Sequence, residues 1–389
     1  MTKMRSDQHV KIWFAKPGSH PLGHHINVCR LREHRRKFPK DTLHLVSNFR
    51  DFTPEHQTYL KRICAELNIQ LIDFYSVKAE IEASTVPDKA VQLELFEIAR
   101  QELSDKNSSL VSASDIVRTL SPVIARGMYS DLDDVKSAHN PLELEAPLGL
   151  LAEVGFEYTV TTGVSSVNDI NNNPLACDEK RNSFLVGYRK LMLSLYTELK
   201  GLKSVYDNML KNGFLKQPML DAIKLRVNPV IAENLRTGKK SLFPLIIRDV
   251  LGALNQEGKL EDAHYQKIMK YMVINFSGPL CMRTAMENYM SEGHFASDCD
   301  RNKLDGWPMP ELLSSMSIVM VYESTHQNDT VWRPNEDTTE ENFQKFYLEP
   351  AARCLQTAWR AYVAKGKQSV DSAPNRAAAF AAPGPMNKE

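Results

Sequence analysis

The feature that most constrains the fold is an alternation of short apolar runs with longer helical patterns in the first half of the chain. Residues 10–14, 43–46, 71–74, 128–132 and 158–161 read as strands bounded by turn residues or polar connections. Between them, the spacing of apolar residues predicts helices over 54–67, 89–103 and 112–125. Because strands joined by helices run parallel, the pattern predicts an α/β fold with a mostly parallel sheet. Ligands of such sheets bind at the carboxyl ends of the strands.

The second half of the chain has a different pattern. From about residue 183 to 290, apolar residues recur at helical spacing, which predicts a helical subdomain packed on the sheet. Its Leu and Met stripes are core-packing residues. The last segment, 368–389, is rich in Ala and Pro with little to bury, so we expect a disordered tail.

Composition excludes several classes of protein. The chain has 389 residues, and its 48 Lys and Arg balance 48 Asp and Glu, so the net charge favours neither nucleic acid nor an anionic membrane as the main ligand. The six cysteines form no CxxC pair, which favours reduced thiols over a zinc knuckle or a disulfide framework. No stretch approaches 18 apolar residues and no secretory signal core is present, so we expect a soluble protein without a membrane span.

The most informative segment is 112–134, SASDIVRTLSPVIARGMYSDLDD. Asp115 and Arg118 are three residues apart in a helical pattern, so both project from one helix face and can hold sugar hydroxyls or a phosphate. Asp131 and Asp133 follow the strand that contains Tyr129, and on an extended chain they point the same way. Two carboxylates at a strand tip can hold a hard divalent cation, although an isolated Asp-x-Asp also occurs on solvated loops.

In combination, these residues form a specific pattern: Ser-Asp-x-x-Arg, then Gly-x-Tyr-x-Asp-x-Asp. It resembles the DXD region of GT-A glycosyltransferases, in the group shared by large clostridial glucosylating toxins, bacterial effector glycosyltransferases and yeast initiating mannosyltransferases. The resemblance implies a GT-A (Rossmann-like) fold over residues 1–335, with a mixed, mostly parallel sheet and the helical subdomain at 183–290.

Three further segments resemble the same family. They are the Asn-rich run 171–176 followed by Phe184, the Ser-Gly-Pro turn at 277–279, and the loop 326–332, HQNDTVW. The plain alternative for the last segment is a surface loop. The donor-binding residues that the resemblance implies are Trp13, Tyr129, Asn172, Asn173, Asn328, Thr330 and Trp332. The metal ligands it implies are Asp131, Asp133, His326 and Asn328.

The first strand departs from the family pattern. Family members have Ile-His-x-x-Trp-x-Gly, whereas this chain has Ile12-Trp13-Phe14-Ala15-Lys16-Pro17-Gly18, with Trp13 in the His place and Lys16 in the Trp place. Trp13 is therefore either a donor contact or a core residue. The departure affects the residue that, in the family, lies against the nucleotide base of the donor. As the donor, UDP-hexose is favoured over GDP-hexose.

The resemblance implies a metal-dependent reaction that uses Mn²⁺ or Mg²⁺. A hexose would pass from a nucleotide-sugar to a protein acceptor with retention of anomeric configuration. Asp115, Arg118, Asp131 and Asp133 would form the catalytic machinery, since a divalent cation at the acidic pair stabilises the departing diphosphate. The other class of function left open is a non-catalytic or weakly active interaction protein on the same scaffold.

The segment 351–367, AARCLQTAWRAYVAKGK, contains four basic residues and no acidic one, and predicts an amphipathic helix within 340–367. Its Leu355, Gln356, Trp359, Arg360 and Lys365 resemble the IQ motif of calmodulin-binding proteins. The alternatives are a helix docked on its own domain and a membrane-surface helix. A calmodulin-regulated enzyme of this family implies either a eukaryotic cytosolic enzyme or a bacterial effector. The effector is favoured, because the catalytic motif resembles those of toxins and effectors, and it would reach the host cell cytosol by a non-classical route and modify a host protein.

Overall fold

The computed structural model describes residues 2–5, 7–23, 25–104, 109–132, 143–146, 150–157, 166–177, 183–211, 213 and 215–291. The chain divides into two compact units, Met1–Asn328 and Asp329–Glu389, and the second lies outside the described residues. Among the described helices, none combines the length and the apolarity needed to span a bilayer.

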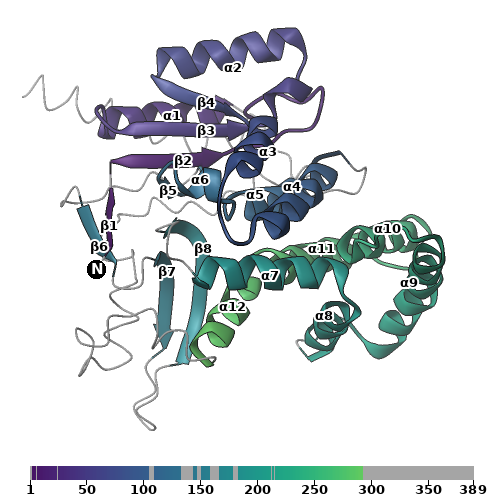
Figure 1. The fold of residues 1–389 in the computed structure, drawn as a ribbon. Helices are drawn as coiled ribbons and strands as arrows, with labels where there is room; N and C mark the ends of the chain where they lie inside the picture. The colour runs from purple at the N-terminus through teal and green to yellow at the C-terminus, as the bar shows by residue number, and fades with distance from the viewer. Residues whose placement is uncertain are drawn as a thin grey trace, which may run out of the picture. The chain divides into compact units, whose positions relative to one another are not determined.

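A mixed sheet forms the centre of the first unit (Figure 1). Its strand order is β4-β3-β2-β5-β8-β7, in which β4, β3, β2 and β5 are parallel and β8 is antiparallel to both β5 and β7. The strands are β2 (Gln8–Ile12), β3 (Thr42–Ser47), β4 (Ile69–Asp73), β5 (Met128–Tyr129), β7 (Leu150–Glu157) and β8 (Ser166–Cys177). A separate antiparallel pair joins β1 (Thr2–Arg5) to β6 (Glu143–Ala146). The predicted α/β class with a mostly parallel sheet is confirmed.

The strand order creates a switch point between β2 and β5. From β2 the chain proceeds to β3 and β4 on one side, then returns to place β5 on the other side of β2. In open α/β sheets, the crevice outside the carboxyl ends of the strands at such a point is where ligands bind. The topology therefore directs attention to the residues that follow β2 and β5.

Successive side chains along β2 point to opposite faces of the sheet, and each face has its own apolar core. Val10, Ile12 and Phe14 belong to one cluster, whereas Trp13 and Ala15 belong to the other. Residues of α1 (His25–Lys37) and α2 (Pro54–Glu66) share the second cluster with β3. The first cluster contains residues of α3 (Phe74–Ala83), α4 (Lys89–Ser104), α5 (Leu110–Val117) and α6 (Ser121–Ile124).

The single helix predicted over 112–125 is wrong, because α5 and α6 are separate. Pro122 has no N–H to donate to the Arg118 carbonyl, so a continuous helix would lose a hydrogen bond and clash at this point. Arg118 is instead the C-cap of α5, and Pro122 lies in the first turn of α6. The break places Arg118 at a helix end rather than in the middle of a helix.

The strand predicted at 128–132 is also shorter than expected. β5 pairs with β2 through Met128 and Tyr129, and the Ser130 N–H still donates to the Val10 carbonyl at 3.3 Å. One residue further along the chain, the Asp131 carbonyl accepts from the Lys11 side chain at 2.7 Å. The regular pairing of β5 with β2 therefore ends at Tyr129, and a side-chain bond from Lys11 follows it. The strand predicted at 158–161 lies outside the described residues.

A group of helices, here named the helical subdomain, lies beside the sheet over the range in which the sequence pattern predicts helices (Figure 1). It comprises α7 (Ser183–Thr197), α8 (Leu199–Lys211), α9 (Gln217–Thr237), α10 (Phe243–Gln256), α11 (Asp262–Phe276) and α12 (Pro279–Ser291). A fully buried ion pair ties α10 to α4, in which Arg248 contacts Glu102. A second buried pair, between Arg189 of α7 and Asp88, has a 2.9 Å separation. The subdomain is therefore joined to the sheet layers by charge as well as by apolar packing.

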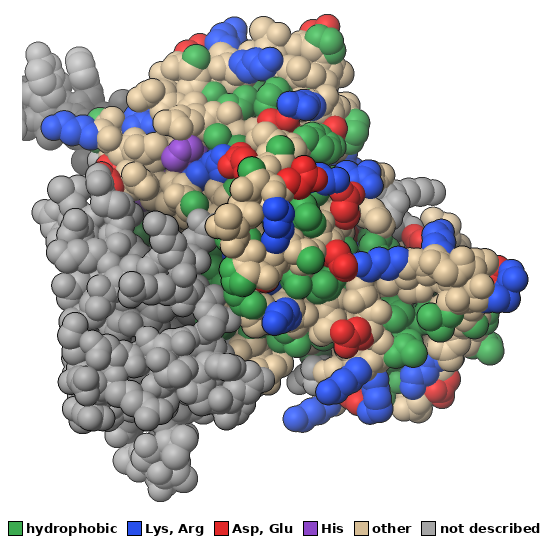
Figure 2. Space-filling view, viewed as in Figure 1, with side chains coloured by type: hydrophobic (Ala, Val, Ile, Leu, Met, Phe, Trp, Pro, Cys, Tyr) green, Lys and Arg blue, Asp and Glu red, His purple; other side chains and the backbone are tan. Residues whose placement is uncertain are grey.

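The described surface carries charges of both signs. Figure 2 shows acidic and basic side chains interspersed over this face, with hydrophobic side chains between them. This agrees with the balanced charge of the sequence, and the visible face presents no large field of one sign.

Candidate functional site

The candidate site is built where β5 ends and meets the helix break after α5. Gly127 makes the entry to β5 possible, since its φ is +133° and a Cβ there would lie 2.4 Å from the Gln8 carbonyl oxygen. Only glycine accepts both the conformation and the close approach. The chain then passes through Tyr129 and Ser130 and emerges at Asp131.

Arg118 is the centre of the cluster. Its Nη2 lies 2.9 Å from Asp115 Oδ1 and 3.6 Å from Asp131 Oδ1. Its guanidinium carbon lies 4.2 Å from the centre of the Tyr129 ring, a cation–π contact. The Tyr129 hydroxyl donates to Asp131 Oδ1. Four residues selected from the sequence motif are thus brought together as one group.

The two carboxylates differ in exposure, and this separates what they can do. The Asp115 side chain is 5% exposed and that of Asp131 is 40% exposed, while Arg118 between them is 4% exposed. Asp115 is thus held inside the protein as the partner of a buried cation. Asp131 lies at the boundary with solvent, where an external ligand can reach its carboxylate.

The charge state of the cluster follows from its burial and partners. Burial raises the pKa of the Tyr129 hydroxyl well above its ordinary value, and the charge of Asp131 raises it further against the opposing effect of Arg118. Burial acts to lower the pKa of Arg118, but the nearby carboxylates of Asp115 and Asp131 act to raise it, and the pKa lies above its ordinary value. At neutral pH, Tyr129 is therefore a neutral hydroxyl donor and Arg118 a fixed cation.

Lys11 of β2 approaches the cluster from the neighbouring strand. Its Nζ donates to Ser130 Oγ at 2.6 Å and to the Asp131 carbonyl at 2.7 Å, although the residue is only 1% exposed. Sequence reasoning did not select Lys11 or Ser130. The available signal was a lysine within an apolar run predicted to be a buried strand, because lysine is seldom fully buried without a partner.

The helical subdomain reaches the same cluster through the turn between α11 and α12. Ser277 Oγ donates to Asp115 Oδ2 at 3.1 Å, and Tyr188 of α7 donates to the Ser277 carbonyl at 2.9 Å. A Cβ at Gly278 would lie 3.4 Å from Asp115 Oδ2, so the turn lies directly against the carboxylate. The predicted 277–279 turn is present, and it fixes the inner carboxylate of the site.

The Asn-rich run lies on β8, the strand beside β5. Leu175 is paired with Tyr129, and the β8–β7 register shifts between Ala152 and Glu153, whose partners are Leu175 and Asn171. Asn172 and Asn173 lie within this irregularity. Bulges of this kind are common next to active sites, because they redirect side chains. The backbone therefore places both asparagines a few residues from the pairing with Tyr129.

Trp13 lies just after β2, partly buried in the second core. A Cβ at Gly23 would lie 2.7 Å from its ring, so the 16–23 loop packs closely on the indole. The Trp13 Nε1 is buried and has no hydrogen-bond partner among the described residues. The donor-binding role of Trp13 stays a prediction.

Many residues selected from the sequence lie outside the described part of the chain. They are Asp133, His326, Asn328, Thr330, Trp332, Leu355, Gln356, Trp359, Arg360 and Lys365. The predicted C-terminal helix at 340–367 and the tail at 368–389 also fall there.

Of the metal ligands predicted from the sequence, the structure describes one, the carboxylate of Asp131. Asp131 offers a hard, half-exposed carboxylate, whereas Asp115 is occupied by Arg118 and Ser277. Among the described residues, no group of three or more His, Cys, Asp and Glu side chains gathers to hold a metal. Magnesium sites of the substrate-assisted type use one or two carboxylates and complete the shell with substrate phosphates and water. Asp131, whose Oδ1 also accepts from the Tyr129 hydroxyl, could supply one carboxylate to a site of that kind.

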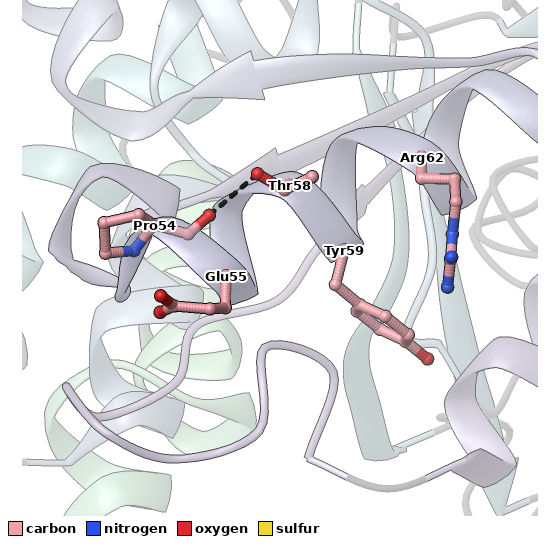
Figure 3. Close-up of a pocket in the computed structure, with 5 residues that line it drawn as sticks. All are labelled: Pro54, Glu55, Thr58, Tyr59 and Arg62. Carbon is pink, nitrogen blue, oxygen red and sulfur yellow. Dashed lines mark hydrogen bonds between the residues drawn. The ribbon is translucent and has the colours of Figure 1, made fainter.

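A surface hollow of about 520 Å³ lies elsewhere, along α2 (Figure 3). It is lined by Pro54, Glu55, Thr58, Tyr59 and Arg62. The Thr58 hydroxyl donates to the Pro54 carbonyl at 2.9 Å, so it is occupied within the helix. The hollow shares no lining residue with the Arg118 cluster.

Comparison with known proteins found no matching family model and no matching curated protein. Solved structures similar to the chain include glycosyltransferases. The catalytic domain of alpha-toxin from Clostridium novyi is 12% identical, with 88% of this chain and 82% of that chain covered and a TM-score of 0.39. The UDP-bound glycosyltransferase domain of the YGT toxin is 10% identical, with 75% and 78% covered and a TM-score of 0.38.

A third similar structure is the bacterial N-acetylglucosamine transferase NleB, at 11% identity. The similarity covers 49% of this chain and 80% of the NleB chain, with a TM-score of 0.29. At these identities and TM-scores, the similarities carry no inference about substrate or mechanism. A function for this chain has to come from its own site and motif.

Proposed function

We propose that the protein is a metal-dependent, retaining glycosyltransferase that moves a hexose from a nucleotide-sugar, UDP-hexose in preference to GDP-hexose, to a protein acceptor. The observation that carries the proposal is the Arg118 cluster at the β2–β5 switch point. It joins a buried Asp115–Arg118 pair to the half-exposed Asp131 at the carboxyl end of β5. The motif that supplies these residues resembles the donor site of GT-A enzymes.

Each residue of the cluster has a separate task in this mechanism. Asp131 would hold the divalent cation, Mn²⁺ or Mg²⁺, together with Asp133 of the predicted Asp-x-Asp. When bound, such a cation neutralises charge that develops on the departing diphosphate. Arg118 supplies a second, fixed positive charge 3.6 Å from the Asp131 carboxylate. Asp115 keeps that guanidinium oriented, and Ser277 in turn orients Asp115.

The remaining parts of the proposal rest on sequence alone. Asn172, Asn173, Asn328, Thr330 and Trp332 would contact the donor, and His326 and Asn328 would complete the metal shell. The IQ-like residues between Leu355 and Lys365 support calmodulin as the regulator. A calmodulin-responsive enzyme would act in a host cell after non-classical secretion, on a host protein.

The test is a panel of UDP- and GDP-sugars with Mn²⁺, with and without calmodulin, read as release of the nucleoside diphosphate. We expect one donor to be turned over, and Asp131→Ala to lower that turnover by about 100-fold or more. The control is Asp221→Ala, an exposed carboxylate on the surface of α9, which should turn over donor like the wild type. If the wild type turns over no donor in either condition, the non-catalytic interaction protein becomes the better description.

A further inference from the structure

A buried lysine lies directly behind the half-exposed carboxylate of the site. Lys11 is the last residue but one of β2, and Val10 and Ile12 on either side of it belong to the apolar cluster on one face of the sheet. Strand alternation directs Lys11 to the opposite face, the same face as Trp13. A lysine in a buried parallel strand is costly unless its ammonium is well solvated by protein groups.

The ammonium of Lys11 makes two short hydrogen bonds across to the end of β5. It donates to Ser130 Oγ at 2.6 Å and to the Asp131 carbonyl at 2.7 Å. Ser130 is 5% exposed, so the bond to its hydroxyl lies where water competes little, whereas the bond to the Asp131 carbonyl is partly buried. These bonds fix the backbone of Asp131, whereas Arg118 and Tyr129 act on its carboxylate.

The Asp131 residue is thus held from two directions. The side-chain oxygen Oδ1 is oriented by Arg118 and Tyr129, and the main chain is fixed by a cation on the adjacent strand. Without Lys11, the Asp131 carbonyl would lose this donor at the point where the chain leaves the sheet. The carboxylate would then be held only through its side-chain contacts with Arg118 and Tyr129, on a backbone that Lys11 no longer fixes.

We propose that Lys11 is a positioning residue, which presents the Asp131 carboxylate to a divalent cation and the diphosphate by clamping the Ser130–Asp131 backbone. The inference rests on the proposed function, because it takes Asp131 as the carboxylate that faces the metal. Lys11 itself contacts neither the metal nor the sugar. Residues that orient metal ligands in this way typically change metal affinity or activity by about 10- to 100-fold when they are replaced.

The test measures Mn²⁺ binding directly, by the loss of the free Mn²⁺ electron paramagnetic resonance signal in the presence of UDP. We expect Lys11→Met to weaken Mn²⁺ binding by about 10- to 100-fold. Ser130→Ala, which leaves the Asp131 carbonyl bond in place, should weaken it by a smaller factor. Lys78→Met, on the exposed side of α3, is the control for loss of a lysine and should bind like the wild type.

Ser47→Ala is the matched control for the serine variant. Ser47 lies at the carboxyl end of the neighbouring strand β3, and its hydroxyl is buried without a hydrogen-bond partner among the described residues. If Lys11→Met does not fold, as judged by circular dichroism, the comparison of Ser130→Ala with Ser47→Ala decides the matter.

The outcomes separate this inference from the proposed function. If Lys11→Met binds Mn²⁺ as tightly as the wild type, the role of Lys11 alone is overturned. The same holds if Ser130→Ala and Ser47→Ala bind Mn²⁺ with equal affinity. A wild type that does not bind Mn²⁺ overturns both proposals. A wild type that binds Mn²⁺ but turns over no sugar donor overturns only the enzymatic function.

Discussion

At the scale of single residues, the site depends on two aspartates with the same chemistry and different surroundings. Asp115 is buried, pairs with Arg118 and accepts from Ser277. Asp131 is 40% exposed and faces solvent beside the same guanidinium. Since a buried charge needs its partner while an exposed one is solvated by water, the first aspartate supports the structure and the second is available for chemistry.

The same substitution at these two positions should therefore have opposite consequences. Asp115→Asn should lower the free energy of unfolding by about 3 kcal/mol, because it leaves the buried Arg118 without its closest carboxylate. Asp131→Asn should lower it by less than about 1 kcal/mol and abolish Mn²⁺ binding. Urea unfolding and Mn²⁺ titration measure the two effects. Equal losses of stability in the two variants would contradict the division of roles.

At the scale of elements, the site is positioned by breaks in regular structure. α5 ends at Val117 because Pro122 prevents a longer helix. β5 ends at Tyr129, and the Lys11 side chain then donates to the Asp131 carbonyl. Between these breaks, Gly127 lets the chain pass within contact of the β2 backbone. The side chains of the candidate site therefore come from element ends, where backbone groups are available and direction changes are tolerated.

Gly127→Ala tests the closeness of this approach. A Cβ would lie 2.4 Å from the Gln8 carbonyl oxygen at a φ of +133°, so the free energy of unfolding should fall by about 3 kcal/mol or more. Gly238→Ala is the matched control, since Gly238 has a φ of +66° and no atom within 4 Å of the added Cβ. It should cost about 1 kcal/mol, the penalty of the left-handed conformation alone. If urea unfolding shows similar losses of free energy for Gly127→Ala and Gly238→Ala, the close contact with β2 does not account for the cost at Gly127.

At the scale of the whole first unit, buried polar networks connect the helical subdomain to the sheet layers. Glu102 of α4 contacts Arg248 of α10 and accepts from the Tyr196 hydroxyl of α7 at 3.0 Å. Arg248 also donates to Ser112 Oγ at 3.1 Å, at the start of α5. The network therefore ends on the same helix that carries Asp115. A change in the position of the subdomain would be transmitted to the site through this helix and through Ser277.

Breaking this network should destabilise the unit as a whole. Glu102→Gln should lower the free energy of unfolding by about 3–5 kcal/mol, because Arg248 remains buried without its counter-charge. The double change Glu102→Leu with Arg248→Met should recover most of that loss, since an apolar pair needs no counter-charge. Urea unfolding of the three proteins gives the comparison. A double variant no more stable than Glu102→Gln would show that the contacts to Ser112 and Tyr196 dominate.

Much of the fold followed from local patterns. The strands at β2, β3 and β4 and the helices α2 and α4 were predicted to within a few residues, because apolar periodicity and turn residues are local properties. The first helix, α1, was missed since its many charged residues obscure an apolar face. The strands β7 and β8 were also missed. β8 has a polar sequence that lacks a strong alternation, although an Asn-rich strand was expected from the family resemblance. β7 is largely apolar, so a local signal for it was present in the sequence.

The sequence by itself determined the pairing of Asp115 with Arg118, because three residues of helix fix their separation, and the placement of Tyr129 two residues before Asp131. Only the tertiary structure decided that Asp115 is buried while Asp131 is not, and which hydrogen-bond donors surround each aspartate. Lys11 reaches Ser130 across 119 residues of sequence, and Ser277 reaches Asp115 across 162. Such contacts depend on the strand order and on the packing of the helical subdomain, which local spacing does not encode.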